Sequence, residues 1–570
     1  MGRPNDEVAE LFQEFADLLS ITGEAAYKVR AYEKAARAIG GYHEDVSALD
    51  LKGLRQIPNV GDAIAKKILD YQETGTIRQL EAVRAEIPAG VRALTAIPTL
   101  GPKKALVLYE ELGISSVDEL AEAIPAGRLE GLKGFGAKTE ENILHGIELM
   151  RRAGDRVLID VAMGVAEEII AALSPLAGRC EYAGSLRRSR ETIGDVDILA
   201  TADDPGPLMA ALVALPLVAE VIARGEKKTS IRTVKGLQVD LRVVPPESYG
   251  AALQYFTGAK AHNVRTREIA VRAGLKLSEY GLFDVESGDL VVSRTEEEVY
   301  ERLGLPWIAP TLREDGGEVD AAIKGELPRL VQLGDLRGDL HSHTDLTDGI
   351  ASLEDMVAAA AAHGWEYFAI TDHAPNLFMQ RMTDEKMLAQ REAVHALGER
   401  YPDLTLLHGT ELNIDAGGEV DWPAEFLSGF DICVASVHSL FTQDRATMTR
   451  RLVRAVENPG VHVLGHPTAR LIGRRASVDA DWDEVFAACA RHRTVLEIDA
   501  FPDRLDLPAD LIRRALRHGV KFSIDSDAHA TGHFANLRYG VGTAQRGWLT
   551  PDDVVNTWPL DRLRAYLAGS

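Results

Sequence analysis

Between residues 339 and 530, seven apolar runs follow one another, and each ends in side chains of the kind that bind metals. The runs with their polar ends are DLHSHTDLTDG (339–349), FAITDHA (368–374), LTLLHGTEL (404–412), ICVASVHS (432–439), VHVLGHPT (461–468), VLEIDAF (495–501) and KFSIDSDAHA (521–530). Segments of helix length separate them, which indicates alternating strands and helices. Such repeats close into a barrel whose functional groups gather at the carboxyl ends of the strands. We therefore predict a seven-fold β/α barrel with a site at one mouth.

These run ends supply nine candidate metal ligands. They are His341, His343, Asp348, His373, Glu411, His438, His466, Asp527 and His529. A single histidine after a strand is usually structural or merely exposed, but this many beside three carboxylates are difficult to explain without metal. Imidazole and carboxylate together favour Zn²⁺, Mn²⁺ or Fe²⁺. A metal cluster of this type lowers the pKa of a water molecule so that it attacks a phosphate ester.

Three similar segments recur nearer the N-terminus. They are LRQIPNVGDAIAKKI (54–68), LTAIPTLGPKKALVLY (94–109) and LEGLKGFGAKTEENI (129–143). The pattern resembles the helix-hairpin-helix, which points turn amides and a helix N-terminus at a DNA phosphate and reads the backbone rather than the sequence. One such hairpin is equally well a simple helical turn, but three in tandem favour DNA contact.

The glycines of these segments are the candidate DNA-contacting residues: Gly61, Gly101, Gly134 and Gly136. Only the third copy keeps both glycines, because Asn59 and Thr99 stand where the first is expected in the other two. Asparagine tolerates the left-handed backbone conformation, whereas threonine disfavours it, which argues against phosphate binding by the second copy.

A third set of carboxylates follows short β-branched runs in the middle of the chain. Asp195 and Asp197, two residues apart in a strand-like run, must project from one face, and GLQVDLRVVPP (236–246) supplies Asp240 from what could be a neighbouring strand. Three converging carboxylates suit two Mg²⁺ or Mn²⁺ ions. The spacing alone is a weak signal, since aspartate is common in turns. Gly184 and Ser185, at a strand-to-helix turn, could cradle a triphosphate.

Three segments of this region closely resemble the family X DNA polymerases, the relatives of polymerase beta: GSLRRSRETIGDVD (184–197), VDLRVVPPESYGAALQYFTGAKAHN (239–263) and LKLSEYGLF (275–283). The resemblance implies that Asp195, Asp197 and Asp240 bind the catalytic metals. It also implies nucleotide-binding roles for Gly184, Ser185, Arg188, Gly194, Tyr255, Phe256, Gly258 and Asn263.

The N-terminal domain of that family can carry a lyase activity in which a lysine forms a Schiff base with a 5′-deoxyribose phosphate. Alignment places Lys67 at the nucleophile position with Tyr32 beside it. A lysine needs desolvation or a cationic neighbour to be nucleophilic, and Lys66 is such a neighbour. The alternative is a solvated helix lysine.

The C-terminal runs resemble the PHP family of phosphoesterases, which implies a distorted (β/α)7 barrel with three metals. One metal would take His341, His343, Glu411 and Asp527, a second Glu411, His438 and His466, and a third Asp348, His373 and His529. Asp499 stands where an asparagine is more usual. Arg470, which follows His466 closely, is either a ligand for DNA phosphates at the barrel mouth or solvated surface.

The order of these regions resembles the bacterial PolX family. We predict a multidomain α/β protein with five parts: a helical lyase-like domain (1–90), a helix-hairpin-helix region (91–153), a polymerase-beta-like α+β palm and nucleotide-binding subdomain (154–315), a linker (316–334) and the PHP barrel (335–570). A net charge of −24 means that DNA contact is local rather than global. The absence of a long apolar run predicts a cytoplasmic protein without a membrane span, and we expect a monomer.

The resemblance implies synthesis across short gaps in base excision repair on gapped or nicked DNA with dNTPs. The PHP site would be a 3′–5′ exonuclease that also cuts at abasic sites. Two alternatives stay open. One is a small-molecule phosphatase with a DNA-binding scaffold, against which the aspartate triad and three hairpins argue. The other is a non-catalytic DNA-bridging protein, against which the nearly complete ligand sets argue.

Overall fold

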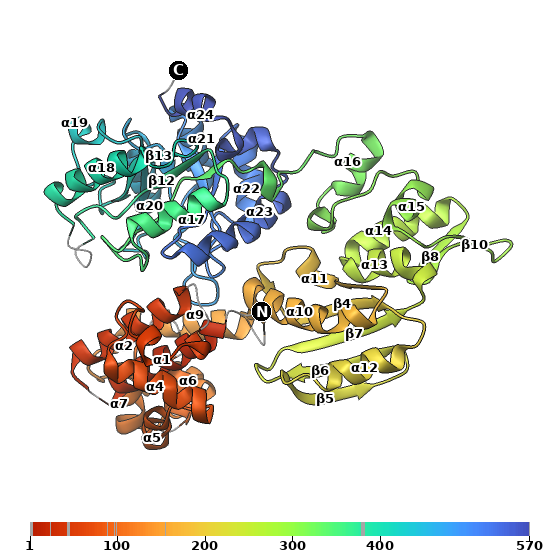
Figure 1. Cartoon of the computed structure of the whole chain (residues 1–570), viewed down its shortest axis with the longest axis horizontal. Helices are drawn as coiled ribbons and strands as arrows, with labels where there is room; N and C mark the ends of the chain where they lie inside the picture. Colours follow the sequence, from red (N-terminus) through yellow and green to blue (C-terminus); the bar gives the residue numbers. More distant parts are fainter. Residues whose placement is uncertain are drawn as a thin grey trace.

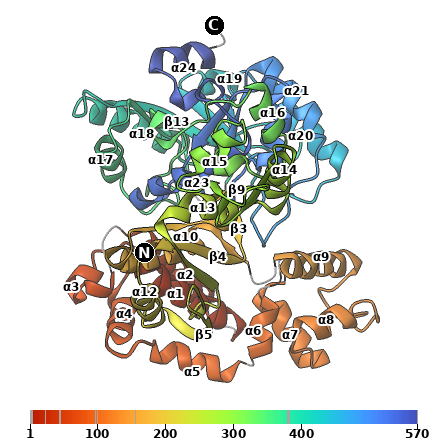
Figure 2. The same ribbon diagram turned by 90° about the vertical axis from the view of Figure 1, so that its right-hand side faces the viewer.

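A computed structural model describes residues 4–22, 24–42, 46–87, 89–95, 97, 100–153, 156–377 and 382–568. Its three regions are a helical N-terminal part, a central part built on a five-stranded sheet, and a C-terminal β/α barrel (Figure 1). In both ribbon views the barrel lies in the upper part of the picture, and the N-terminal helices and the central sheet lie lower (Figures 1 and 2). Thr99 lies outside the described residues. Among the described helices, none is both long enough and apolar enough to span a bilayer.

Amphipathic helices build the N-terminal part around one core that runs from Val8 to Ile147. The helices are α1 (Pro4–Ile21), α2 (Ala26–Gly41), α3 (Leu51–Leu54), α4 (Asp62–Thr74), α5 (Arg78–Glu86), α6 (Ala89–Thr95), α7 (Pro102–Leu112), α8 (Val117–Ala123) and α9 (Ala137–Ala153). Helices α1 and α2 pack closely, and Phe12 and Phe15 of α1 lie against the ring of Tyr32. Helix α1 also contacts α7, so the core continues past residue 90. The domain boundary that the sequence analysis places at residue 90 stays a prediction.

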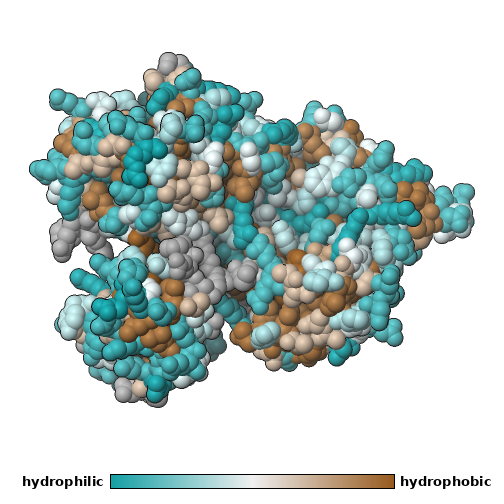
Figure 3. All heavy atoms as spheres, viewed as in Figure 1, coloured by the Kyte–Doolittle hydropathy of each residue, from teal (hydrophilic) through white to brown (hydrophobic). Residues whose placement is uncertain are grey.

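The palm is a mixed sheet with the strand order β2-β4-β7-β6-β5. Its strands are β2 (Arg179–Tyr182), β4 (Asp195–Thr201), β5 (Val218–Arg224), β6 (Lys228–Thr233) and β7 (Gln238–Val244), with a short pair β1 (Val157–Leu158) and β3 (Thr192–Ile193) beside it. Helices α10 (Ile159–Leu173), α11 (Gly184–Arg187) and α12 (Pro205–Val213) accompany the sheet. Apolar surface is visible over this region in Figure 3, and Val221 and Ile222 of the edge strand β5 are exposed.

A smaller lobe follows the palm. It consists of α13 (Tyr249–Thr257), α14 (Lys260–Arg272), β8 (Leu275–Ser278), β9 (Gly281–Asp284), β10 (Leu290–Val292), α15 (Glu296–Arg302) and α16 (Glu318–Lys324). A buried ion-pair cluster ties this lobe to the palm, since the guanidinium of Arg187 contacts Glu296 at 2.9 Å and Arg313 contacts the same carboxylate at 2.6 Å. This cluster fixes α15 against α11, the helix that begins at the predicted nucleotide-binding turn.

The barrel contains seven parallel strands in the order of the sequence. They are β11 (Gly338–Asp339), β12 (Tyr367–Ile370), β13 (Thr405–Asn413), β14 (Ile432–Ser436), β15 (Val463–Leu464), β16 (Val495–Asp499) and β17 (Phe522–Asp525). The helices are α17 (Leu353–Ala362), α18 (Asp384–Gly398), α19 (Ala424–Leu427), α20 (Arg445–Val456), α21 (Trp482–His492), α22 (Ala509–Leu516), α23 (Leu537–Arg546) and α24 (Leu560–Leu567). The amide of His343 donates to the carbonyl of Ala528 at 2.8 Å, so the first and last strands nearly close the ring. The predicted seven-fold barrel is confirmed.

Two candidate metal centres

The three predicted palm carboxylates meet at the end of two paired strands. Strands β4 and β7 are parallel, with Asp197 opposite Asp240 and Asp195 two residues before Asp197. Each of the three offers an oxygen within 4.8 Å of the others. An all-carboxylate donor set of this size is what Mg²⁺ and Mn²⁺ prefer, so the residues fit such ions.

The negative charges of these aspartates repel one another. Burial and the neighbouring Asp195 and Asp240 raise the pKa of Asp197 to about 6. Burial also opposes ionisation of Asp240, but hydrogen bonds from Lys228, Ser230 and Gln238 outweigh it and lower the pKa of Asp240. The ammonium of Lys228 lies 2.6 Å from the Asp240 carboxylate. The three carboxylates therefore need a positive charge nearby in order to be ionised together, and a bound metal ion would supply that charge.

The predicted nucleotide-binding turn lies directly on the triad. Gly184 has φ of 60°, and a Cβ added there would lie 2.5 Å from Oδ2 of Asp197, so this position needs glycine both for its backbone and for its space. Ser185 follows in the first turn of α11 and is partly buried. Gly194 precedes β4, and a Cβ there would lie 3.0 Å from the guanidinium of Arg156.

Arg188 ends this turn and points toward the smaller lobe. Its Nε donates to Glu314 at 3.0 Å and its Nη1 to the carbonyl of Thr257 at 2.5 Å, beside Gly258. The remaining predicted residues lie on the same lobe: the side-chain amide of Asn263 donates to the carbonyl of Tyr255 at 2.7 Å. The guanidinium carbon of Arg242 lies over the ring of Phe256, 4.4 Å from the centroid of that ring. The structure thus brings the turn at Gly184 next to the triad, and Arg188 joins this turn to the lobe that carries the other predicted nucleotide-binding residues.

The predicted residues of the N-terminal part lie in hairpin turns and on α4. Gly61 and Gly101 are the N-caps of α4 and α7, Gly136 immediately precedes α9, and Gly134 has φ of 91°. Asn59 has φ of 61°, which is the left-handed conformation expected of an asparagine at a glycine position.

Lys67 lies on α4 with its ammonium 5.5 Å from the centroid of the Tyr32 ring. The ammonium donates to the carbonyl of Ala63 at 3.2 Å, and the side chain lines a surface pocket together with Lys66, Asp70 and Arg78. The lysine therefore has the predicted aromatic neighbour and a pocket beside it.

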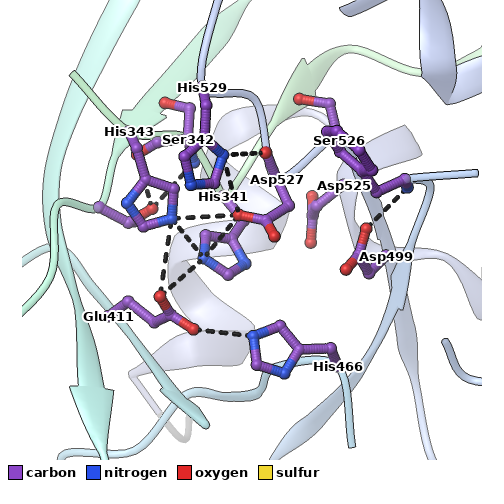
Figure 4. Close-up of polar contacts among 12 residues, drawn as sticks. His341, Ser342, His343, Glu411, His466, Asp499, Asp525, Ser526, Asp527 and His529 are labelled. Atoms are coloured by element: carbon purple, nitrogen blue, oxygen red, sulfur yellow. Dashed lines mark hydrogen bonds and ion pairs between the residues drawn. The ribbon is translucent and has the colours of Figure 1, made fainter. Parts of the chain in front are cut away.

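All nine predicted barrel ligands converge at one mouth, around Glu411. Its Oε1 lies 3.0 Å from Nε2 of both His438 and His466, and its Oε2 lies 2.8 Å from Nδ1 of His373. Figure 4 shows His341, His343 and His466 turned toward this carboxylate. His341 and His343 each lie 3.6 Å from Oε2.

Eight of the nine ligands form three overlapping groups, each with atoms within 4.8 Å of one another: His343 with Asp348, His373 and His529; His341 with His343 and Asp527; and His373 with Glu411 and His438. The ninth ligand, His466, lies 3.0 Å from Oε1 of Glu411. Histidines 343 and 373 are thus each shared between two groups, whereas the family resemblance assigned each to one metal. The partition differs because the ring of His343 lies between those of His373 and His529, with centroid distances of 4.5 and 4.4 Å.

The electrostatics of this cluster favour cations. Burial lowers the pKa of His466 to about 3, with help from the charge of Arg504, so its imidazole is neutral and able to bind a metal. Burial opposes ionisation of Glu411, but the facing histidines hold its pKa well below the usual range. Nδ1 of His343 and Oδ1 of Asp348 are buried, 3.7 Å apart, and neither has a hydrogen-bond partner among the described residues. Mn²⁺, Zn²⁺ or Fe²⁺ would satisfy these atoms.

Two positioning residues of the barrel site escaped the sequence analysis. Glu497, in the VLEIDAF run, accepts from Nδ1 of His341 at 2.6 Å and from the amide of His466. Asn413 accepts from Nδ1 of His438 at 2.7 Å. Such partners fix the orientation of a metal-binding imidazole. The alternation of strand β16 was an available signal, since it places Glu497 and Asp499 on one face.

Arg470 has partners within the protein that the sequence analysis did not foresee, and DNA contact by this residue stays a prediction. Its guanidinium donates to Glu191 of the palm at 2.8 Å and to the carbonyls of Arg504 and Leu505, and only 11% of the side chain is exposed. These bonds use two of the three guanidinium nitrogens, and the bond to Glu191 joins the barrel to the palm. Sequence could not reveal this, because Glu191 lies 279 residues away.

Family models and relatives agree with this architecture. Models match a helix-hairpin-helix domain (residues 3–77), a SAM-like helix-hairpin-helix tandem (91–148), the DNA polymerase beta thumb (252–314) and a PHP domain (339–500).

Among curated relatives, the DNA polymerase/3′-5′ exonuclease PolX of Bacillus subtilis (strain 168) is 34% identical over 98% of this chain and 99% of its own length. DNA polymerase lambda of Rattus norvegicus is 25% identical over 54% of this chain and 56% of its own length. A probable phosphatase of Thermoanaerobacter sp. (strain X514) is 25% identical over 40% of this chain and 93% of its own length. Because the Bacillus subtilis relative is 34% identical over 98% of this chain, and the helix-hairpin-helix, thumb and PHP models match in the expected order, the chain belongs to the PolX enzymes, the family X DNA polymerases that carry a PHP phosphoesterase domain.

Proposed function

We propose that the chain fills short gaps in DNA from its palm and trims 3′ ends from its barrel. The observation that carries this proposal is the presence of two separate metal-ligand clusters, one of three carboxylates and one of imidazoles and carboxylates, on a chain with helix-hairpin-helix turns. Gapped or nicked DNA and dNTPs are the substrates, and base excision repair is the setting. The protein acts as a cytoplasmic monomer.

At the palm, Asp195, Asp197 and Asp240 would hold Mg²⁺ or Mn²⁺. When bound, the ions activate the primer hydroxyl and offset the charge of the phosphates. The amides of the turn at Gly184 and Ser185, with Arg188, bind the triphosphate. Tyr255, Phe256 and Gly258 form the wall beside the sugar, and Asn263 lies toward the base.

At the barrel, the nine ligands around Glu411 would hold three ions of Mn²⁺, Zn²⁺ or Fe²⁺. When bound, the ions acidify water for attack on a phosphodiester. The chain itself contributes orientation: Glu497 holds the ring of His341, and Asn413 holds that of His438. We propose that this centre is a 3′–5′ exonuclease and also cuts at abasic sites.

The test uses a one-nucleotide-gapped duplex, dNTPs and Mg²⁺ or Mn²⁺, with the parent, Asp240→Ala and His343→Ala. We expect Asp240→Ala to lose extension alone and His343→Ala to lose 3′ degradation alone. A parent that neither extends nor degrades DNA contradicts the proposal. Hydrolysis of small phosphate esters by that parent would instead support a phosphatase, as the name of the Thermoanaerobacter relative suggests. DNA binding without any activity would support a bridging protein.

The lyase is a separate part of the proposal. Lys67 is proposed as the nucleophile toward a 5′-deoxyribose phosphate, because its ammonium lies beside Tyr32 in a pocket with the cationic Lys66 and Arg78. Borohydride should trap a covalent adduct with the parent and with Lys66→Ala, but not with Lys67→Ala. Equal trapping by Lys67→Ala would assign the activity to another amine.

A further inference from the structure

Helix α23 of the barrel packs directly on the nucleotide-binding turn of the palm. Gly542, in the middle of α23, approaches Ser189 so closely that a Cβ added to it would lie 2.8 Å from the Ser189 side chain. Ser189 has φ of 52°, so the chain turns sharply just after Arg188. Tyr539, also of α23, belongs to the apolar core of the palm. The turn is therefore supported from outside its own domain.

The last residue of α23, Arg546, contacts the backbone of this turn and the carboxylate that pairs with Arg188. Its Nη1 donates to the carbonyl of Arg188 at 3.0 Å and to Oε1 of Glu314 at 2.9 Å. The same Oε1 accepts from Nε of Arg188 at 3.0 Å. One guanidinium of the barrel thus holds both the backbone of Arg188 and the carboxylate that orients its side chain.

The contact is well shielded from water. Only 13% of the side chains of Arg546 and Arg188, and 27% of that of Glu314, are exposed. The carbonyl of Arg188 lies at the C-terminal end of α11, where helix carbonyls lack partners within the helix. Removal of the Arg546 guanidinium would leave both that carbonyl and Glu314 without this donor, so that Glu314 and the carbonyl of Thr257 alone would orient the Arg188 side chain.

We propose that Arg546 is a positioning residue for the polymerase reaction, through which the PHP barrel sets the affinity of the palm for the incoming nucleotide triphosphate. The inference rests on the proposed function, because it takes Arg188 as a triphosphate ligand. In the part of the chain that the structure describes, the side-chain hydrogen bonds of Arg546 go to the Arg188 carbonyl and to Glu314, and none goes to the aspartate triad. It acts by holding the backbone and the side chain of Arg188 in one arrangement before the nucleotide binds, so the ordering does not oppose binding.

A second arginine of α23 allows the proposed role of Arg546 to be distinguished from a general contribution to the interface between the barrel and the palm. Arg538, on the same helix, donates to Glu167 of the palm at 2.7 Å and to the hydroxyl of Tyr539, and it has no described bond to the turn. Arg538→Ala therefore removes an interdomain ion pair of similar size without touching Arg188, which makes it the matched control.

The experiment measures KM and kcat for dNTP on a one-nucleotide-gapped duplex, and the Kd for dNTP on a dideoxy-terminated primer. For Arg546→Ala we expect KM and Kd to rise about tenfold, the change that corresponds to about 1.4 kcal/mol, with kcat changed about twofold or less. Arg546→Lys should recover part of the affinity, because an ammonium can reach Glu314 or the Arg188 carbonyl but lacks the planar set of N–H donors of a guanidinium. Arg538→Ala should resemble the parent.

A second variant, Gly542→Ala, pushes α23 away from Ser189 and should raise the KM for dNTP in the same direction. Unchanged 3′ degradation in every variant shows that the barrel is folded. Unchanged nucleotide affinity in Arg546→Ala, or an equal loss in Arg538→Ala, would overturn the inference. If the parent does not extend the primer, the proposed function fails, and the dNTP Kd of parent and Arg546→Ala then decides this inference by itself.

Discussion

At the scale of single residues, the two centres depend on a few positions that have close contacts with several ligands or with a ligand's carboxylate. Glu411 is one, because it lies within 3.6 Å of five imidazoles and its two oxygens face opposite sides of the cluster. Gly184 is another, because a Cβ added there would lie 2.5 Å from Oδ2 of Asp197. Substitutions at such residues should affect one centre and leave the other intact.

We expect Gly184→Ala to lower kcat/KM for nucleotide incorporation at least about tenfold while 3′ degradation continues, because the added methyl would displace the Asp197 carboxylate. The control is Gly236→Ala, at a glycine with φ of 83° and no atom within 4 Å of the added Cβ. It introduces similar backbone strain, costing about 1 kcal/mol, in open space. Steady-state incorporation assays distinguish the two. Equal effects would show that backbone strain, not the displaced carboxylate, matters.

Glu497→Gln should weaken metal binding at the barrel by about tenfold to a hundredfold, because it removes the carboxylate that orients His341. The exposed Glu484→Gln, on α21, is the control. Mn²⁺ affinity measured by chelator competition gives the result directly. Unchanged affinity would mean that the barrel ligands hold their orientation without Glu497.

At the scale of elements, the position of α11 is set by α15 of the smaller lobe. Glu296, in the first turn of α15, joins Arg187 and Arg313 in a cluster that is almost fully buried. Burial opposes ionisation of Glu296, but Arg313 and Arg187 outweigh it and lower its pKa to about 2. A carboxylate with a lowered pKa stabilises the fold above its unfolded pKa, and this stabilisation is lost as the pH falls toward the folded value.

Glu296→Gln should therefore reduce the free energy of unfolding by about 3 kcal/mol at pH 7, since it leaves two buried guanidinium groups without a counter-charge. The difference from the parent should shrink between pH 4.5 and pH 2, as the parent carboxylate becomes protonated. Denaturant unfolding at several pH values measures it. Glu297→Gln, an exposed neighbour in the same helical turn, should change little. A difference independent of pH would exclude the ion pairs as the cause.

At the scale of the whole molecule, the barrel is joined to the palm and to the smaller lobe by ion pairs between residues that lie far apart in sequence. Arg470 meets Glu191, Arg538 meets Glu167 and Arg546 meets Glu314. In the view of Figure 2 the barrel rests above the palm and the N-terminal helices. The two centres nevertheless have separate ligand sets, so the removal of metal should act on them separately.

Chelation should lower the melting temperature of the barrel, because a metal that binds only the folded state stabilises it in proportion to RT ln(1 + [M]/Kd). Saturating Mn²⁺ at about a hundred times its Kd adds about 2.7 kcal/mol. That corresponds to a shift of roughly 5 to 10 °C for a domain of this size. Calorimetry should show the shift in the parent and in Asp240→Ala but not in His341→Ala/His343→Ala. A shift that persists in the double variant would place the stabilising metal elsewhere.

Much of the fold and of both centres follows from local patterns. Apolar runs that end in His341, Glu411 or Asp527 required strands whose carboxyl ends meet, and the two-residue spacing of Asp195 and Asp197 required one face. These inferences succeeded because a strand alternates its side chains and a barrel gathers its strand ends, whatever the rest of the chain does.

The sequence by itself thus determined the order of the domains, the seven-fold barrel and the families of both centres. Only the tertiary structure decided the partner of Arg470, the sharing of His343 and His373 between ligand groups, the support of His341 by Glu497 and the grip of Arg546 on Arg188. The physical reason is that each of these contacts joins side chains from separate elements, and 358 residues separate Arg188 from Arg546. Which charges meet across such distances depends on how packed surfaces fit, and no local periodicity records it.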